Sequence, residues 1–351
     1  TNFLTPIKND IANGQTLESI DGSSKRSRMV SYITRLNYDY KNKYYLGGSY
    51  RMDGSSRLHR DNRWGSFWSV SGAWRIIEED FMKPTSKWLT DLKLRASYGV
   101  NGTLPSDLYG YMGLTSLSGG YMENPALIQS QIENRDLEWE TNYNLNIGLD
   151  FGFFNRLNFT LEYYTRTTKN LLMDCPVSMT TGFSSYLMNI GEVKNQGVEL
   201  EINSKNIVSK DFDWSTSFTL SHNKQMVDDI GSEDFISAYD SPGNNSYMMY
   251  GYVKGYPLNS LWGFKYGGTW KNADERKENE ITKTYVSVSN TDGGARYYDV
   301  NHDGVMSRED LIYQGNADPY LYGGLQNTFY IHGFKLGVYF AYSLGGKIYN
   351  Y

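Results

Sequence analysis

The segment DVNHDGVMSRED, residues 299–310, spaces its oxygen-bearing side chains as a calcium-binding loop does. Counted from Asp299, such residues recur at every second position, and Gly304 stands at position 6, where an EF-hand-like loop bends sharply. The candidate ligands are Asp299, Asn301, Asp303, Val305 through its carbonyl, Ser307 and Asp310. The spacing therefore predicts a Ca²⁺ site that orders the loop rather than one that performs catalysis.

The same segment has a second interpretation, which needs no metal. Asp and Asn side chains stabilise tight turns by accepting hydrogen bonds from nearby backbone N–H groups. Asp310 is also shorter than the bidentate Glu that is usual at position 12 of such loops. The residues on either side of 299–310 show no helical pattern, so both interpretations stay open.

No other group of residues has the spacing of a catalytic site. The four histidines are scattered along the chain at His59, His222, His302 and His332. No nucleophile elbow and no zinc-ligand spacing accompanies them. The adjacent Glu78, Glu79 and Asp80 are interpreted as turn charges, and Trp139 as a residue of a membrane-interface aromatic belt rather than a sugar platform. The sequence does not predict an enzyme.

Aromatic residues gather with Gly and Asn in the long segments that we interpret as loops. The candidates for substrate contact are Tyr109, Tyr111, Tyr121, Tyr247, Tyr250, Tyr252 and Trp262. Aromatic faces beside amide groups suit glycans or peptides. The same composition also suits loops that pack only on one another.

Two long alternating runs at 137–169 predict the fold. In the first run, one face carries Tyr143, Leu145, Ile147, Leu149 and Phe151; in the second, one face carries Leu157, Phe159, Leu161 and Tyr163. A period of two predicts β-strands, and the turn formers at 152–155 join them as a hairpin. Strands of about 12 residues exceed the length of about 5–6 that is usual in soluble sandwiches. They are typical of a transmembrane barrel, whose outer face meets lipid and whose inner face meets water.

The connections between such runs alternate in length. Short turns are predicted at 41–43, 153–155, 206–211 and 332–333, and long loops at 53–62, 100–136, 170–189 and 225–322. Up-and-down outer-membrane barrels have this pattern, with short periplasmic turns and long extracellular loops. The chain is therefore predicted to be all-β and to supply about ten antiparallel strands.

Composition is consistent with this fold and excludes other classes. The 351 residues include 31 Tyr, 15 Phe and 8 Trp, as interfacial aromatic belts require, although a secreted, tyrosine-rich all-β protein would have a similar composition. The net charge of −5 gives no basic footprint for nucleic acid. The single cysteine, Cys175, excludes an internal disulfide framework.

No apolar run approaches the roughly 20 residues of a helical span. No signal peptide opens the sequence, and we expect the start of the exported protein to be processed or missing.

Several blocks resemble the SusC/RagA family of TonB-dependent outer-membrane transporters. They are YRMDGSSR (50–57), NRWGSFWSVSGAWRIIEEDFMK (62–83), DLKLRASYGVNG (91–102), NRDLEWET (134–141), GFSSYLMNIGEVKNQGVELEI (182–202), GYPLNSLWGFKYGG (255–268), YYDVNHDGVMSREDLIYQGNADPYLYGG (297–324) and GGKIYNY (345–351). The resemblance implies that residues 1–351 are part of a barrel of about 22 strands. The plug domain, the TonB-contacting segment and the terminal strands are expected to lie outside this sequence. Ten strands alone would leave two unpaired edges in lipid, which also points to a longer protein.

The resemblance further implies a function. The expected activity is TonB-dependent import of oligosaccharides or peptides across the outer membrane of a Gram-negative, Bacteroidota-like cell. The expected partners are a SusD-like surface lipoprotein, the TonB complex and outer-membrane lipid, with no nucleic acid. A barrel that binds glycan as an adhesin, without active transport, is the alternative.

Overall fold

The computed structural model describes residues 24–121, 124–231, 236–237, 248–287 and 289–348. The chain divides into two compact units. One comprises Thr1–Asn155 and Glu162–Glu192, and the other comprises Arg156–Leu161 and Val193–Tyr351.

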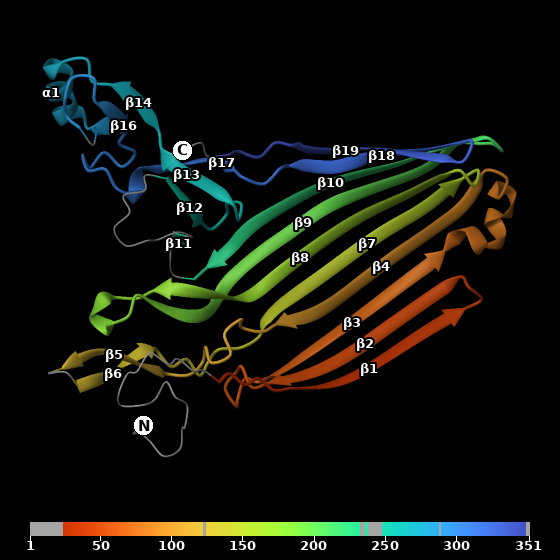
Figure 1. The fold of residues 1–351 in the computed structure, drawn as a ribbon, viewed down its shortest axis with the longest axis horizontal. Helices are drawn as coiled ribbons and strands as arrows, with labels where there is room; N and C mark the ends of the chain where they lie inside the picture. Colours follow the sequence, from red (N-terminus) through yellow and green to blue (C-terminus); the bar gives the residue numbers. More distant parts are fainter. Residues whose placement is uncertain (1–23, 122–123, 232–235, 238–247, 288, 349–351) are drawn as a thin grey trace. The chain divides into compact units, whose positions relative to one another are not determined.

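The first unit is built from long strands joined by hairpin turns, loops and short helical turns (Figure 1). Its own strands are β1 (Met29–Tyr40), β2 (Tyr44–Ser55), β3 (Trp64–Arg75), β4 (Leu89–Thr103), β5 (Leu114–Tyr121), β6 (Asn124–Gln131) and β7 (Glu140–Phe153). Two 3-10 helices, Ile76–Glu78 and Asp80–Thr85, connect β3 to β4. Strands β8 (Leu157–Pro176) and β9 (Ser185–Val208) contribute residues to both units, and a 3-10 turn, Met179–Thr181, lies between them.

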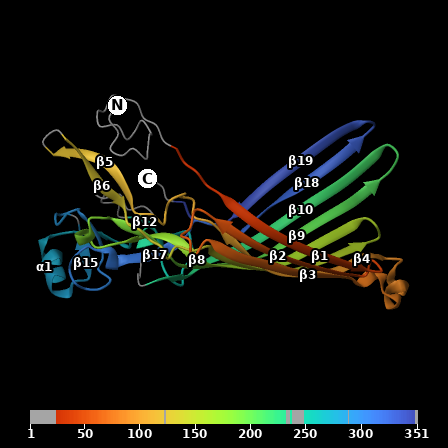
Figure 2. The same ribbon diagram turned by 90° about the horizontal axis from the view of Figure 1, so that it is seen from below.

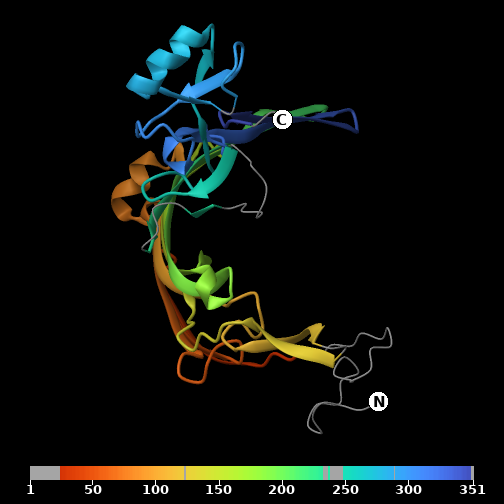
Figure 3. The ribbon, with the colours of Figure 1, turned by 90° about the vertical axis from the view of Figure 1, so that its left-hand side faces the viewer.

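The second unit combines long strands with two small sheets. The long strands are β10 (Phe212–Ile230), β18 (Leu321–Ile331) and β19 (Phe334–Leu344). The small elements are β11 (Ile236–Ser237), β12 (Met248–Tyr252), β13 (Ser260–Phe264), β14 (Tyr266–Thr269), α1 (Ala273–Thr282), β15 (Tyr285–Ser287), β16 (Ala295–Tyr298), a 3-10 turn (Arg308–Asp310) and β17 (Leu311–Asn316). They form sheets of order β11-β12-β13-β17 and β14-β16-β15. Figure 3 shows α1 beside β14 and β16.

The ten long strands follow one another in the hydrogen-bonded order β1-β2-β3-β4-β7-β8-β9-β10-β18-β19. Neighbouring strands pair antiparallel, as in the register of β1 with β2 and of β4 with β7. Strands β1 and β19 stand at the two ends of this order, so the described sheet does not close on itself. The predicted all-β antiparallel barrel wall is confirmed. None of the described helices is long and apolar enough to cross a membrane.

Register separates apolar from polar side chains across the first unit. One row of opposed residues is Tyr38, Leu46, Gly72, Ala96 and Ile147. The adjacent row, one residue along each strand, is Asn37, Gly47, Ser71, Ser97 and Asn146. Because successive side chains point to opposite faces of a strand, the first row forms an apolar face and the second a polar one. Ile147 is 42 % exposed on the apolar face, where a barrel meets lipid.

Three of the short turns have the geometry that tight hairpins need. The central residues have positive φ at Lys41 and Asn42 (both 54°), Phe154 and Asn155 (both 54°), and His332 and Gly333 (45° and 90°). Positive φ at both central positions is the type I′ turn, whose twist matches that of the paired strands. In the first unit, the β5–β6 hairpin extends from the opposite ends of the long strands (Figure 2).

The long loops contain more regular structure than the sequence predicts. Strand β8 continues to Pro176 and β9 begins at Ser185, so the loop expected at 170–189 shrinks to 177–184. The segment 100–136 contains the β5–β6 hairpin, and 225–322 contains two sheets and α1. Beyond the membrane a strand has no lipid side and no strict alternation of apolar residues, which is why these elements lack the predicted pattern.

Candidate functional site

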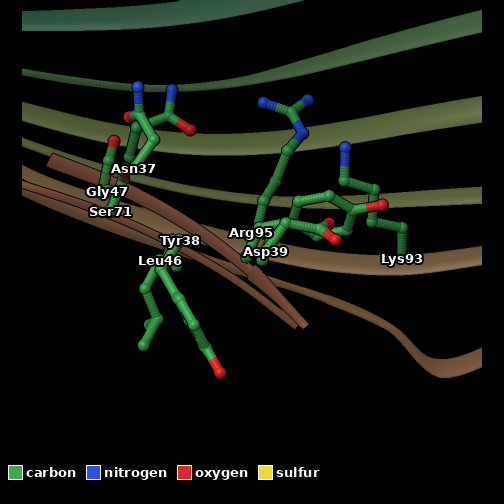
Figure 4. Close-up of a pocket in the computed structure, with 14 residues that line it drawn as sticks. Asn37, Tyr38, Asp39, Leu46, Gly47, Ser71, Lys93 and Arg95 are labelled. Atoms are coloured by element: carbon green, nitrogen blue, oxygen red, sulfur yellow. The ribbon is translucent and has the colours of Figure 1, made fainter. Parts of the chain in front are cut away.

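The polar face of the first unit carries a hollow of about 490 Å³. Figure 4 shows Asn37, Ser71, Lys93 and Arg95 on one side of the strands and Leu46 on the other. Five strands, β1 to β4 and β7, contribute to the hollow, because residues of one row face the same side. It therefore offers amides, hydroxyls and charges of both signs to a polar solute.

Arg95 joins two carboxylates on this polar face. Its Nε donates to Asp150 Oδ2 at 3.1 Å, and its Nη2 forms an ion pair with Glu162. Gly148 lies directly opposite Arg95 in the register of β4 with β7. A Cβ at Gly148 would lie 2.6 Å from Arg95 Cζ, so glycine makes room for the guanidinium. Arg95 alternates with apolar residues along β4, but its partners Asp150 and Glu162 are too far away in the sequence for this pattern to reveal them.

A small apolar cluster lies at the loop ends of the first-unit strands. Leu58, Phe67, Leu137 and Trp139 are all buried, and the rings of Phe67 and Trp139 meet edge to face with centroids 5.2 Å apart. Gly65 lies beneath this pair, since a Cβ there would come 2.5 Å from Phe67 Cζ. Trp139 is only 7 % exposed, and its Nε1 donates to the carbonyl of Arg63 at 3.1 Å.

The prediction that Trp139 belongs to an aromatic belt is therefore wrong. Its ring is buried against Phe67 and is not available to the membrane interface. The error arises because Trp139 precedes β7 and packs on distant loop residues, which alternation along one strand does not reveal. The stacked pairs Tyr32–Trp64 (6.2 Å) and Tyr44–Trp74 (6.4 Å) lie instead near the opposite ends of β1 to β3.

The candidate substrate residues of the first unit are partly buried. The hydroxyl of Tyr109 accepts a hydrogen bond from the backbone N–H of Arg26 at 2.9 Å. Tyr111 packs against the apolar cluster and meets the ring of His59 edge to face at 6.0 Å. The side chain of Tyr121 is outside the described part of the chain.

The candidates of the second unit fall around one aromatic cluster. Trp262 in β13 is 8 % exposed, and its Nε1 donates to Ser260 Oγ at 2.8 Å. Its ring meets Tyr256 at 4.8 Å and Tyr313 at 5.8 Å, and these two rings are 5.2 Å apart. Tyr256 and Tyr313 are 37 % and 38 % exposed. The rings of Tyr256 and Tyr313 therefore form an exposed aromatic surface, and the buried ring of Trp262 packs against both of them.

Sequence reasoning missed Tyr256 and Tyr313 as surface residues. Tyr256 stands close to Trp262 in the chain, but Tyr313 arrives through the pairing of β13 with β17. Burial raises the pKa of the Tyr313 hydroxyl, with a smaller contribution from Tyr256, so this hydroxyl is uncharged at neutral pH. Of the other candidates, Tyr252 is half-buried at the end of β12. Tyr247 and the side chain of Tyr250 lie outside the described residues.

The 299–310 loop joins β16 to β17 and is held by its own polar side chains. Asp299 Oδ2 accepts from the N–H of Gly304 at 2.7 Å, and Asp303 Oδ1 accepts from that of Val305 at 2.6 Å. Asp310 accepts from the N–H groups of Val300 (2.8 Å) and Ser307 (3.0 Å). Among the described residues, no three His, Cys, Asp or Glu side chains converge closely enough to hold a metal ion.

Comparison with known proteins identifies the family. A family model described as TonB dependent receptor-like, beta-barrel matches residues 4–350. The chain belongs to this family. A TonB-dependent receptor of Formosa agariphila is 33 % identical over the full chain, and the match spans 35 % of that relative. TonB-dependent receptor SusC of Bacteroides thetaiotaomicron is 36 % identical over 68 % of the chain and 25 % of its own length.

Solved structures show the same fold. A structure of the RagAB peptide transporter aligns with 97 % of this chain at a TM-score of 0.74 and 28 % identity. The aligned region is 36 % of the RagAB protein chain. The RagAB peptide importer in its closed-closed state gives a TM-score of 0.73 at 29 % identity, over 91 % of this chain and 33 % of that one. The resemblance to the SusC/RagA family is thus confirmed, and this TonB-dependent receptor barrel is located in the outer membrane. The chain spans about a third of the length of these relatives.

Proposed function

We propose that this TonB-dependent receptor barrel forms part of the wall of an importer that carries oligosaccharides or peptides across the outer membrane. The polar hollow around Asn37, Ser71 and Arg95 carries the proposal, because it lies on the face opposite the exposed apolar row. A wall with one lipid-facing and one polar face suits passage of a water-soluble solute. The chain's similarity to SusC and to RagAB, which is described as a peptide importer, supports the same class of activity.

The proposal includes the partners that such an importer requires. Energy would come from the TonB complex, and a SusD-like surface lipoprotein would bind at the extracellular side. No covalent chemistry is part of the proposed activity. The residues of the wall would bind and guide the solute and would not react with it.

Substrate contact outside the membrane is proposed for Tyr256 and Tyr313. Two adjacent, half-exposed rings on a buried Trp262 provide a rigid surface on which the apolar face of a sugar ring or peptide side chain can stack. This surface also favours the second candidate, a glycan-binding adhesin without transport.

Uptake assays separate the two candidates. The full-length gene is deleted and restored in its host, and entry of labelled oligosaccharides and peptides into the periplasm is measured with and without TonB. An importer loses uptake in both the deletion strain and the TonB-deficient strain, while surface binding persists without TonB. If the protein is an adhesin, deleting its gene reduces glycan binding at the cell surface, and uptake is unchanged in both the deletion strain and the TonB-deficient strain.

Paired substitutions then test the aromatic surface. We expect Tyr256→Ala combined with Tyr313→Ala to reduce substrate affinity by roughly thirtyfold, since each of the two ring-stacking contacts is worth about 1 kcal/mol. Tyr266→Ala is the matched control, because Tyr266 is an exposed tyrosine (59 %) in the other small sheet. Equal affinity in the double variant and the control would remove Tyr256 and Tyr313 from the proposal.

A further inference from the structure

The carboxylate of Asp299 is buried at the start of the 299–310 loop and is only half satisfied. The residue is 2 % exposed. Its Oδ2 accepts one backbone hydrogen bond, from Gly304, whereas its Oδ1 is buried and has no hydrogen-bond partner. A buried carboxylate oxygen without a partner loses the hydration it had in water, which is strongly unfavourable.

The interpretation of this loop as a metal-free turn accounts for the other polar groups but not for this oxygen. Asn301 Oδ1 and Asp303 Oδ1 accept from the backbone N–H groups of Asp303 and Val305, as in ordinary Asx turns. Asp310 is fully buried, and both of its oxygens accept backbone hydrogen bonds. Only Asp299 Oδ1 is left over, and a cation or a water molecule must occupy the space beside it.

The charge around Asp299 favours a cation over a water molecule. The loop contains the carboxylates of Asp299, Asp303, Glu309 and Asp310. Two cations oppose them, Arg308 within the loop and Lys283, whose Nζ donates to the carbonyl of Asp303, so the local charge stays negative. Among the described residues, neither Asp299 nor Asp310 forms an ion pair, although both are buried. Two buried carboxylates without a positive partner are costly, and a divalent cation removes that cost.

The hydrogen bond from Gly304 places the Asp299 carboxylate on the inner side of the loop. Gly304 has a φ of 83°, so the chain turns back toward Asp299 at position 6. The same turn brings the oxygens at positions 3, 5, 7, 9 and 12 of the loop around one centre in calcium-binding loops. In this structure Asn301 Nδ2 donates a hydrogen bond to Asp303 Oδ2 at 3.0 Å. Binding would replace that contact.

We propose that the 299–310 loop binds one Ca²⁺ ion, with Asp299 Oδ1 as its first ligand. Asp303, Asn301, the carbonyl of Val305, Ser307 and Asp310 would complete a shell of about six to eight oxygens at about 2.3–2.6 Å. Oxygen-only ligands and a net negative loop favour Ca²⁺ over transition metals. The partly hydrated, strictly octahedral Mg²⁺ fits such a cage less well.

The ion would link the two small sheets of the second unit. The loop leaves β16, which belongs to the three-stranded sheet, and enters β17, which belongs to the four-stranded one. It also contacts the end of α1, because Lys283 Nζ donates to the carbonyl of Asp303 at 2.9 Å. Calcium would therefore fix the base of the aromatic surface formed by Tyr256 and Tyr313, since Tyr313 lies on β17.

Calcium titration of the full-length protein tests the proposal. The purified transporter is treated with EDTA in detergent, exchanged into metal-free buffer and titrated with CaCl₂ by calorimetry. The titration extends to several millimolar, because extracellular calcium modules bind with Kd of about 10⁻⁴–10⁻³ M. Asp299→Asn keeps the size of the side chain and removes its charge. Glu280→Gln removes one exposed charge from α1, outside the loop, and is the matched control.

We expect Asp299→Asn to lose one bound Ca²⁺ per chain and Glu280→Gln to keep it. Terbium luminescence sensitised by the neighbouring Tyr298 should fall in parallel, and Ca²⁺ should displace the terbium. A wild-type protein that binds no Ca²⁺ overturns the proposal, as does an Asp299→Asn variant with unchanged stoichiometry. The second result would leave a water molecule beside Oδ1.

A measurement on the wild type covers the case in which Asp299→Asn does not fold. Trypsin can cleave after Arg308 inside the loop, and the fragments are compared in Ca²⁺ and in EDTA. Protection of the Arg308 site by Ca²⁺, but not by Mg²⁺, supports the proposal. Equal cleavage in both conditions overturns it.

Discussion

At the scale of single residues, Arg95 is the charged group on which two carboxylates of the polar wall depend. Its guanidinium pairs with Asp150 and Glu162 on neighbouring strands and is 31 % exposed. Removing the cation takes the guanidinium away from two carboxylates that both face it. The polar wall thus contains one position where a single substitution changes the charge balance of three strands.

We expect Arg95→Ala to lower the stability of the full-length barrel by about 1–2 kcal/mol, less than a fully buried pair would cost because water reaches the site. The temperature at which the folded band is lost in heat-modifiability gels measures the change. Asp150→Asn added to Arg95→Ala should recover part of the loss by removing one of the stranded charges. A single variant that melts with the wild type would show that the ion pairs contribute little.

Glu79 is a second residue whose negative charge has defined partners in the structure. It accepts hydrogen bonds from the Tyr44 hydroxyl at 2.5 Å, Trp74 Nε1 at 3.0 Å and Lys43 Nζ at 3.2 Å. The Tyr44 hydrogen bond, followed by those from Trp74 and Lys43, holds the pKa of Glu79 below its ordinary value of 4.5. It thereby links the β1–β2 turn to the connection between β3 and β4.

A lowered pKa makes the contribution of Glu79 depend on pH in a defined direction. The stabilisation is fully present above the ordinary pKa of 4.5 and is lost as the pH falls through the lower pKa of the folded protein. We expect Glu79→Gln to lower Tm at pH 7 and the difference from wild type to shrink below pH 4.5. Thermal scans of both proteins from neutral to acidic pH measure it. A difference that stays constant with pH would assign the effect to packing.

At the scale of elements, each long strand has one face for lipid and one for water. Ile147 and Asn146 are neighbours in β7 and belong to the apolar and polar rows, respectively. A charge on the lipid face must be buried in hydrocarbon, whereas a charge on the polar face stays hydrated. Adjacent residues of one strand should therefore respond oppositely to the same substitution.

We expect Ile147→Arg to destabilise the full-length barrel by about 2–4 kcal/mol and Asn146→Arg by less than about 1 kcal/mol. Equilibrium urea unfolding in lipid vesicles measures both free energies. Equal costs would indicate that β7 has no lipid-facing side, which would contradict the assignment of the two rows.

The alternation of side chains also explains what the sequence could and could not predict. Leu145, Ile147 and Leu149 recur at every second residue because this face of the strand contacts lipid. The long strands, and which of their faces is apolar, were therefore predictable from the sequence. The β5–β6 hairpin and the small sheets carry no such pattern because they lie beyond the lipid. Trp139 and Tyr313 depend on contacts between segments far apart in the chain, which no local period encodes. Spacing alone could locate the 299–310 loop but could not show that one oxygen of Asp299 is unsatisfied.

At the scale of the whole molecule, the strand order ends at β1 and β19. Each of these strands pairs on one side within the described residues, with β2 and β18, respectively. Unpaired backbone N–H and C=O groups cannot be left in hydrocarbon. The edges of β1 and β19 must find further strands before the sheet can be stable in a membrane.

We expect residues 1–351 expressed alone to give no folded monomer, because the free edges would pair between copies. Size-exclusion chromatography in detergent should show large aggregates and no heat-modifiable band, whereas the full-length protein gives both a defined particle and the band. A monodisperse, heat-modifiable preparation of 1–351 would mean that this sheet can satisfy its own edges.

The packing of Phe67 has a consequence for how these barrels change over evolution. Its ring occupies the space that side chains at Gly65 and Gly102 would fill, and Trp139 covers it from β7's loop end. A larger residue at either glycine is tolerated only if the ring at position 67 shrinks, and a smaller ring leaves Trp139 unsupported. These four positions are thus expected to be inherited together, so that lineages of the family differ there by coordinated exchanges rather than by single steps.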